Sequence, residues 1–197
     1  MSDTKKSESG NDAGAAENDD ARWAEKKRKQ KAARDRMLAT KTREKGLLMV
    51  HTGKGKGKTT AAMGLAMRAL GNGMKVGIIQ FVKGKWETGE REIFELFPDR
   101  VTIKVMGEGF SWDSQDRQRD IAAAEAAWEM AKEMIADPDY GLVVLDELNI
   151  PLRYDHLDIN DVVAGLQAKQ PDMHVVVTGR NAKAELIEAA DMVTDMT

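Results

Sequence analysis

Short apolar runs alternate with helix-like segments from residue 46 onward. Because each run is apolar on both faces of a strand, we expect a parallel sheet that helices cover on both sides. Strands are expected at 46–50, 75–81, 101–106, 141–147, 173–179 and 192–196. Helices are expected at 59–70, 90–97, 116–136, 158–168 and 182–190.

The loops beyond the carboxyl ends of these strands are the expected ligand site, because open parallel sheets bind ligands there. Every unusual stretch of the sequence falls in one of these loops, which predicts one site built from several of them. The loops are 52–58, 82–90, 107–115, 146–149 and 179–181.

The stretch HTGKGKGKTT at residues 51–60 has the chemistry of a phosphate-binding loop. The general pattern is G-x-x-x-x-G-K-[ST] between a strand and a helix. Aligned on its Gly-Lys-Thr triplet, the position of the first glycine holds Thr52, and a glycine follows at Gly53. Glycines let backbone N–H groups turn toward an anion, and the helix N-terminus adds partial positive charge. The alternative is a basic glycine-rich turn, but strand, triplet and helix coincide here.

Two acids at the end of the fourth expected strand fit a nucleotide with a metal ion. LVVLDE at 142–147 places Asp146 and Glu147 beside the phosphates. Either acid can hold Mg²⁺ directly or through water, together with the Thr59 hydroxyl, while Lys58 reaches phosphate oxygens. The sequence therefore predicts an ATP or GTP site. The expected fold is α/β and P-loop NTPase-like (RecA-like), with a mostly parallel sheet of about six strands and helices on both faces.

Two further glycine-rich loops at the same edge carry aromatic residues. QFVKGKWETGE at 80–90 contains Trp86, and MGEGFSWD at 106–113 contains Phe110 and Trp112. Exposed aromatic rings cost solvation unless something flat and apolar covers them. The residues alone leave two possibilities: the rings fold back onto the core, or they face a ligand.

The N-terminal residues differ in charge from the rest of the chain. Residues 1–20 hold two lysines and six acids (2 − 6 = −4), and residues 21–45 hold eleven Lys/Arg and three acids (11 − 3 = +8). We expect a disordered acidic tail at 1–21 and a basic helix at 22–45, followed by one domain at 46–197. The basic helix is solvated, binds nucleic acid, or closes as a flap over an anionic ligand.

The composition excludes several classes of protein. The sequence has no cysteine, which removes disulfides and thiolate chemistry. It also has no apolar run near the ~18 residues of a membrane span, and its N-terminus lacks an apolar secretory region. We therefore expect a cytoplasmic protein with no membrane segment.

Five motifs in order resemble those of the P-loop corrinoid adenosyltransferases, the ATP:cob(I)alamin adenosyltransferases of the vitamin B12 pathway. They are TGKGKGKTTAA, QFVKGKWETGER, GFSWD, VVLDEL and VVVTGR. The likeness covers residues 46–197, and Thr52 in place of the general first glycine is typical of this family. Family members usually continue for a short tail beyond the point where DMVTDMT stands here.

The resemblance implies transfer of the 5′-deoxyadenosyl group of ATP to the Co(I) centre of a corrinoid, with release of triphosphate. The corrinoid is cobalamin or a precursor of the cobyrinic acid a,c-diamide type. The resemblance also implies Mg²⁺ or Mn²⁺, an external reductant such as a reduced flavin protein, and a homodimer. It favours the flap over nucleic-acid binding for the basic helix. The alternatives are a RecA-like ATPase coupled to another substrate or to nucleic acid, and a non-enzymatic carrier of adenosylated corrinoid.

The resemblance finally implies roles for individual residues. Phe110 and Trp112 would displace the lower cobalt ligand with an apolar wall, and they are expected to be catalytic together with Lys58. The expected metal ligands are Thr59, Asp146 and Glu147. The expected nucleotide- and corrinoid-binding residues are Thr52, Gly53, Lys54, Gly55, Lys56, Gly57, Lys58, Thr59, Thr60, Arg68, Trp86 and Arg180, with Lys83 beside Trp86; for the two arginines a salt bridge within the fold is the alternative.

Overall fold

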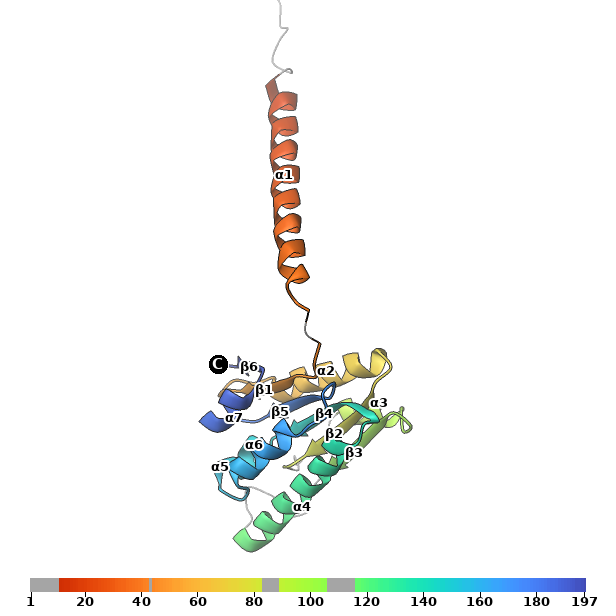
Figure 1. Cartoon of the computed structure of the whole chain (residues 1–197), viewed down its shortest axis with the longest axis vertical. Coiled ribbons are helices and arrows are strands. Elements are labelled where there is room, and N and C mark those ends of the chain that lie inside the picture. Colours follow the sequence, from red (N-terminus) through yellow and green to blue (C-terminus); the bar gives the residue numbers. More distant parts are fainter. Residues whose placement is uncertain (1–10, 43, 83–88, 106–115) are drawn as a thin grey trace, which may run out of the picture. The chain divides into compact units, whose positions relative to one another are not determined.

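The computed structural model describes residues 11–42, 44–82, 89–105 and 116–197, with side chains from residue 18 onward (Figure 1). The chain divides into two units, Met1–Glu44 and Lys45–Thr197. Phe110, Trp112, Trp86 and Lys83 lie outside the described residues. No helix in the described part of the chain has the length and hydropathy needed to cross a membrane.

The first unit contains one long helix, α1 (Asn11–Ala39). Its side chains from residue 18 to 39 are exposed, including Trp23, Met37 and Leu38. The helix begins inside the segment 1–21 that composition predicted to be a disordered tail. Alanines at 13, 15 and 16 account for this difference, because alanine has the highest helix propensity.

The second unit is built on a sheet of six parallel strands, as the alternating pattern predicted. The strand order is β3-β2-β4-β5-β1-β6. The strands are β1 (Leu48–Thr52), β2 (Lys75–Gln80), β3 (Val101–Val105), β4 (Tyr140–Asp146), β5 (His174–Thr178) and β6 (Met192–Asp195). Neighbouring strands are parallel in all five pairings.

Helices cover both faces of this sheet. The six helices of this unit that lie within the described residues are α2 (Lys58–Gly71), α3 (Gly89–Glu95), α4 (Arg117–Ala136), α5 (Asn149–Arg153), α6 (Ile159–Gln167) and α7 (Ala184–Ala189). Alternate residues of each central strand point to opposite faces. Val143 and Leu145 of β4 pack with Trp128 of α4, whereas Leu142 and Val144 belong to the cluster that contains α2.

The five helices predicted between residues 59 and 190 agree with the structure to within a few residues, and one helix of this unit was missed. The predicted basic helix at 22–45 differs more, because α1 spans Asn11–Ala39. Asp158 caps α6, as predicted, by accepting a hydrogen bond from the N–H of Asn160 at 2.7 Å. The missed helix is α5, which has five residues and contains Pro151. A segment this short shows no helical periodicity in the sequence, so tertiary contacts decide it.

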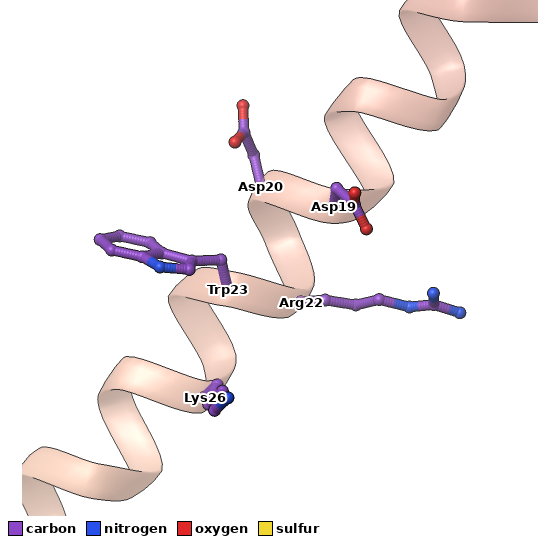
Figure 2. Close-up of a pocket in the computed structure, with 5 residues that line it drawn as sticks. All are labelled: Asp19, Asp20, Arg22, Trp23 and Lys26. Atoms are coloured by element: carbon purple, nitrogen blue, oxygen red, sulfur yellow. The ribbon is translucent and has the colours of Figure 1, made fainter.

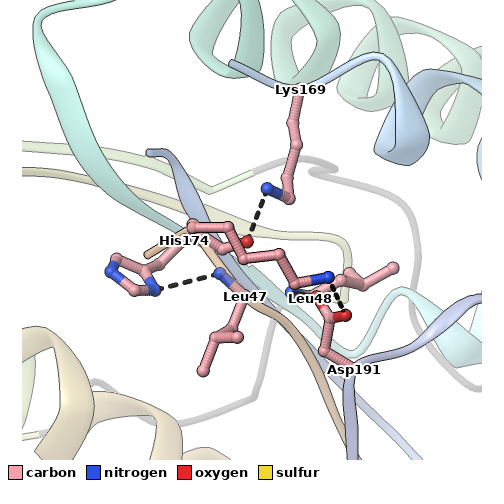
Figure 3. A network of polar contacts seen from close by, with 7 residues as sticks. Leu47, Leu48, Lys169, His174 and Asp191 are labelled. Carbon is pink, nitrogen blue, oxygen red and sulfur yellow. Dashed lines mark hydrogen bonds and ion pairs between the residues drawn. The ribbon is translucent and has the colours of Figure 1, made fainter. Parts of the chain in front are cut away.

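Polar side chains at the amino edge of the sheet bind backbone groups of the first strand (Figure 3). Asp191 accepts from the N–H of Leu48 at 3.0 Å and pairs with Lys45. Nδ1 of His174 accepts from the N–H of Leu47 at 3.1 Å. Lys169 donates to the carbonyl of Gly46 at 2.7 Å. These bonds fix where the first strand enters the sheet.

Candidate functional site

The phosphate loop connects the carboxyl end of β1 to the N-terminus of α2, at the sheet edge that the sequence predicted. Gly53 and Gly57 have φ of 98° and 99°, a left-handed conformation that favours glycine. Gly57 is also the N-cap residue of α2. The loop therefore brings backbone N–H groups and a helix N-terminus to one place, which is the arrangement that binds anions.

Lys58 holds the loop in shape. Its ammonium donates to the carbonyl of Gly53 at 2.9 Å and to that of Gly55 at 2.5 Å, and the residue is buried. The Lys58 carbonyl lies 3.4 Å from Nδ1 of His51. A lysine ammonium has three donors, so it can bind an anion while it keeps the loop closed. Lys54 and Lys56 are exposed on the same loop.

Thr52 and the C-terminal residues explain why this loop departs from the general pattern. The Thr52 hydroxyl accepts from the N–H of Ala182 at 3.1 Å, which joins the phosphate loop to the loop after β5. The N–H of Met196 donates to the Thr52 carbonyl at 2.9 Å, and Gly55 donates to the Met196 carbonyl at 2.6 Å. A Cβ on Gly53 would overlap Asp195 and Met196. The loop is thus packed against the C-terminal residues, and glycine is required at position 53.

Asp146 lies at the end of β4 and accepts hydrogen bonds from three other elements. Thr59 and Thr178 both donate to its Oδ1, at 2.8 and 2.7 Å. The Gln80 amide donates to Oδ2 at 3.4 Å. Asp146 is buried, and these donors satisfy both oxygens of its carboxylate. The predicted pairing of this acid with the phosphate loop is therefore present.

Glu147 follows in a left-handed conformation with φ of 59°. Its backbone N–H donates to the hydroxyl of Thr178 at 2.9 Å. Burial raises the pKa of the Glu147 carboxyl, and the neighbouring charge of Asp146 raises it further, whereas Lys58 and Arg180 lower it. A partly desolvated acid beside another acid is unstable in its charged form, and a bound cation would relieve that cost.

These residues fit a divalent cation. Thr59, Asp146 and Glu147 supply a hydroxyl and two carboxylates, the oxygen donors that Mg²⁺ prefers. Within the described ranges, no three His, Cys, Asp or Glu side chains lie together in a way that could hold a metal ion. Such a cation would therefore need further oxygens from phosphate and water, as in other nucleotide sites.

The other predicted residues fall in different places. Thr60 is exposed in the first turn of α2. Arg180 follows β5 and acts on the pKa of Glu147, so it lies near the acids. Arg68 is ten residues beyond the start of α2, about 15 Å along the helix from the phosphate loop. The structure therefore brings Arg180 to the site but not Arg68.

Sequence analysis did not single out Gln80, Thr178 or Asn149. Gln80 and Thr178 bind Asp146, and Asn149 donates to the carbonyl of Gly179 at 2.8 Å. Gln80 and Thr178 are polar residues at the ends of otherwise apolar strands. That position at the carboxyl edge was a signal that could have marked both of them as site residues.

An apolar groove lies between α2 and α3 beside the phosphate loop. It begins at Thr60 and is lined mainly by Met63, Met67, Ile93 and Phe94, with a volume of about 500 Å³.

A shallow hollow on the surface of α1 does not form an enclosed binding site (Figure 2). Its lining residues all come from one helix, and their side chains point in different directions rather than around a common space. They are Asp19, Asp20, Arg22, Trp23 and Lys26. One helix surface cannot enclose a ligand, so we assign no site there.

Comparison with known proteins gives relatives over most of the chain. A corrinoid adenosyltransferase of Pseudomonas aeruginosa is 54% identical over 178 residues, which covers 90% of this chain and 88% of the relative. One of Sinorhizobium sp. is 55% identical over 183 residues, with 92% and 86% covered. Corrinoid adenosyltransferase CobA of Salmonella typhimurium is 42% identical over 177 residues, with 90% and 89% covered.

Among solved structures, the flagellar accessory protein FlaH of Methanocaldococcus jannaschii has a similar fold. The TM-score is 0.51 at 11% identity, over 77% of this chain and 71% of that protein. This likeness concerns the fold alone.

The family model described as "ATP:corrinoid adenosyltransferase BtuR/CobO/CobP" matches residues 44–197. That range contains the phosphate loop, the two acids and every strand of the sheet. The family match, the sequence identities to the relatives and the geometry of the site at the carboxyl edge all point to the same family. The chain belongs to the ATP:corrinoid adenosyltransferase family.

Proposed function

We propose that this protein transfers the 5′-deoxyadenosyl group of ATP to the Co(I) centre of a corrinoid, either cobalamin or a precursor. The observation that carries the proposal is the phosphate loop, closed by Lys58 and facing Asp146 and Glu147, in a chain of this family. In the reaction the cobalt forms a bond to the ribose C5′, and the C5′–O bond breaks. Both electrons of the new bond come from Co(I), and triphosphate leaves with the electron pair of the broken bond.

The phosphate loop has a clear task in such a reaction. The leaving group is a polyanion, and Lys54, Lys56 and Lys58 can neutralise its growing charge. Lys58 is already fixed by two carbonyls of the loop, so it needs little rearrangement when charge develops. The remaining residues of the cradle, from Thr52 to Thr60, would bind phosphate oxygens through backbone N–H and hydroxyl groups.

A divalent cation, Mg²⁺ or Mn²⁺, would be held by Thr59, Asp146 and Glu147. When bound, it neutralises phosphate charge and orients the triphosphate. The protein's own contribution is to hold the two carboxylates beside the loop, through the bonds from Thr59 and Thr178 to Asp146.

Phe110 and Trp112 are proposed to line the lower face of the corrin, with Trp86 and Lys83 on the corrinoid side. An apolar wall that displaces the lower ligand would make Co(II) easier to reduce. An external reductant, such as a reduced flavin protein, would supply the one electron that converts Co(II) to Co(I). The double variant Phe110→Ala/Trp112→Ala is expected to lose adenosylation when Co(II) is supplied with a reductant. It should keep more activity when Co(I) is supplied directly.

Several further features belong to the same proposal. They are a homodimer, a cytoplasmic location, and closure of the basic segment 22–45 over the corrinoid. Arg180 is a candidate ATP contact because of its place beside Glu147. Arg68 is a weaker candidate because it lies near the other end of α2.

The experiment is anaerobic. The protein is mixed with chemically reduced cob(I)alamin and Mg-ATP while the corrinoid spectrum and the phosphate products are followed. A light-sensitive adenosylcobalamin spectrum with stoichiometric triphosphate is the expected result. Accumulation of ADP and phosphate without a spectral change would instead identify an ATPase and overturn the proposal.

A further inference from the structure

Thr178 links the two acids of the site through a single side chain. It is the last residue of β5 and is fully buried. Its hydroxyl donates to Oδ1 of Asp146 at 2.7 Å and accepts from the N–H of Glu147 at 2.9 Å. We propose that Thr178 is a positioning residue: its hydroxyl sets the Asp146 carboxylate and the Glu147 backbone so that both acids face the cation of the nucleotide. This role rests on the proposed function, because it assumes that a metal nucleotide binds there.

The bonds to Asp146 leave room for a cation. Thr59 and Thr178 each have one hydroxyl proton, and both protons go to Oδ1 of Asp146. The lone pairs of the Thr59 hydroxyl then remain available to a cation, as do further lone pairs of the carboxylate. Without Thr178, Asp146 would be held at Oδ1 only by Thr59, which is itself an expected ligand.

The backbone of Glu147 has a conformation that needs support. Its φ of 59° is uncommon for a residue with a side chain. Its N–H is held by Thr178, and its carbonyl accepts from the N–H of Ile150 at 3.0 Å. These two bonds fix the turn and so set the direction of the Glu147 side chain.

Gly179, directly after Thr178, completes the arrangement. A Cβ at this position would lie 2.7 Å from the Cβ of Asn149 and 3.2 Å from Oε2 of Glu147. The Gly179 carbonyl accepts from the Asn149 amide at 2.8 Å. The end of β5 therefore packs closely against the turn after β4, and the Thr178 side chain connects both to the Asp146 carboxylate.

A purely structural role for Thr178 makes a different prediction, and the test separates the two. The full chain is prepared as Thr178→Val, which keeps the shape of the side chain and removes the hydroxyl, and as Thr178→Ser, which keeps the hydroxyl. Mn²⁺ binding in the presence of ATP is measured by electron paramagnetic resonance. ATP binding without metal is measured by calorimetry.

For T178V we expect Mn²⁺ binding in the presence of ATP to weaken by about 10- to 100-fold, the usual effect of losing a residue that orients metal ligands. ATP binding without metal should change little, because the phosphate loop is unaltered. T178S should bind Mn²⁺ like the parent protein. A structural role would weaken both kinds of binding together.

The role is overturned if folded T178V binds Mn²⁺ as the parent does, or if T178S is as weak as T178V. If T178V does not fold, T178A replaces it: T178A and T178S both lack the γ-methyl group, and only T178S keeps the hydroxyl. Equal Mn²⁺ binding by that pair also overturns the role. A parent protein that fails to bind Mn²⁺ with ATP would instead overturn the metal site of the proposed function, and the role of Thr178 with it.

Discussion

The two edges of the sheet use acidic residues in opposite ways. At the carboxyl edge, burial and the charge of Asp146 raise the pKa of Glu147. At the amino edge, the hydrogen bond from Lys45 and that from the Leu48 N–H lower the pKa of Asp191. The folded chain therefore stabilises the charge of Asp191 and destabilises that of Glu147. Glu147, whose charge the fold disfavours, is therefore a candidate for ligand binding. Asp191, paired with Lys45 and bound to the N–H of Leu48, has a structural role at the other edge.

The largest effect is expected from Glu147→Gln. Adenosyl transfer should fall at least about 100-fold, because a metal ligand is lost. The free energy of unfolding at neutral pH should rise by about 1 kcal/mol, since a poorly solvated charge is removed. Stopped-flow spectroscopy of the corrinoid and thermal unfolding check the two effects.

The pH dependence of stability adds a second test of the same residue. Because its pKa is raised in the folded state, the ionised Glu147 opposes folding. The parent protein should lose stability as pH rises from the unfolded value near 4.5 through the raised folded pKa. E147Q should lack that component. A loss of stability in E147Q at neutral pH would contradict the conclusion that the fold disfavours the charge of Glu147 but favours that of Asp191.

The second effect concerns one glycine at each edge. Gly53→Ala should lower stability by at least about 2 kcal/mol, because φ is 98° and the new Cβ overlaps Asp195 and Met196. It should also weaken ATP binding, since the loop must shift. Gly46→Ala would overlap the Met173 carbonyl at the amino edge. It should lower stability without changing ATP affinity per folded molecule. Chemical denaturation and calorimetry measure both quantities, and equal loss of ATP affinity in the two variants would contradict this.

A smaller effect is expected from Asp191→Asn, the counterpart of E147Q. The variant should lose about 0.5–1 kcal/mol of stability near neutral pH, because solvent screens this exposed ion pair, and keep its transfer rate. Because the pKa of Asp191 is lowered, its contribution is present above the unfolded value near 3.8 and disappears as pH falls through the folded pKa. Denaturant unfolding should therefore separate the parent from D191N clearly at pH 7 and progressively less as the pH is lowered below 3.8.

The smallest effect involves His174. Burial lowers its pKa, and Lys169 lowers it further. Its Nδ1 accepts from the N–H of Leu47, which requires that nitrogen to be unprotonated. Stability should fall as pH drops from the unfolded value near 6.5 toward the lower folded pKa. In His174→Asn the asparagine side chain can still accept the hydrogen bond from Leu47 but does not titrate. The thermal midpoint of H174N should therefore vary less between pH 7.5 and 5.5 than that of the parent protein. An unchanged pH dependence in H174N would exclude His174 as its source.

Much of the fold could be predicted because its signals are local. The apolar runs predicted the six strands, and the Gly-Lys-Thr triplet predicted the first residue of α2 to within one position. Asp158 was recognised as a cap because a capping side chain acts on the N–H two residues later. The helical state of Asn11–Ala21 was not predicted, since a charge-rich composition can conceal alanine helix propensity.

The site residues also fall into those that the sequence predicted and those that it did not. Glycines, lysines and acids are recognisable because their chemistry is intrinsic, so Lys58, Thr59, Asp146 and Glu147 were found by pattern and the structure places them together. Thr178 was not found in this way: its place at the carboxyl end of an apolar strand could mark it as a site residue, but not as the partner of Asp146 and Glu147. Its importance depends on β5 lying beside β4.

The sequence by itself determined the six strands, most of the helices, the phosphate loop and the family, because these follow from periodicity and from residues that are neighbours along the chain. Only the tertiary structure decided which side chains hold the acids and where the loop is braced. Thr59, Asp146 and Thr178 are separated by 87 and 32 residues, yet they share one carboxylate oxygen. Contacts at such separations depend on strand order, which is set by the packing of the whole sheet rather than by any local pattern.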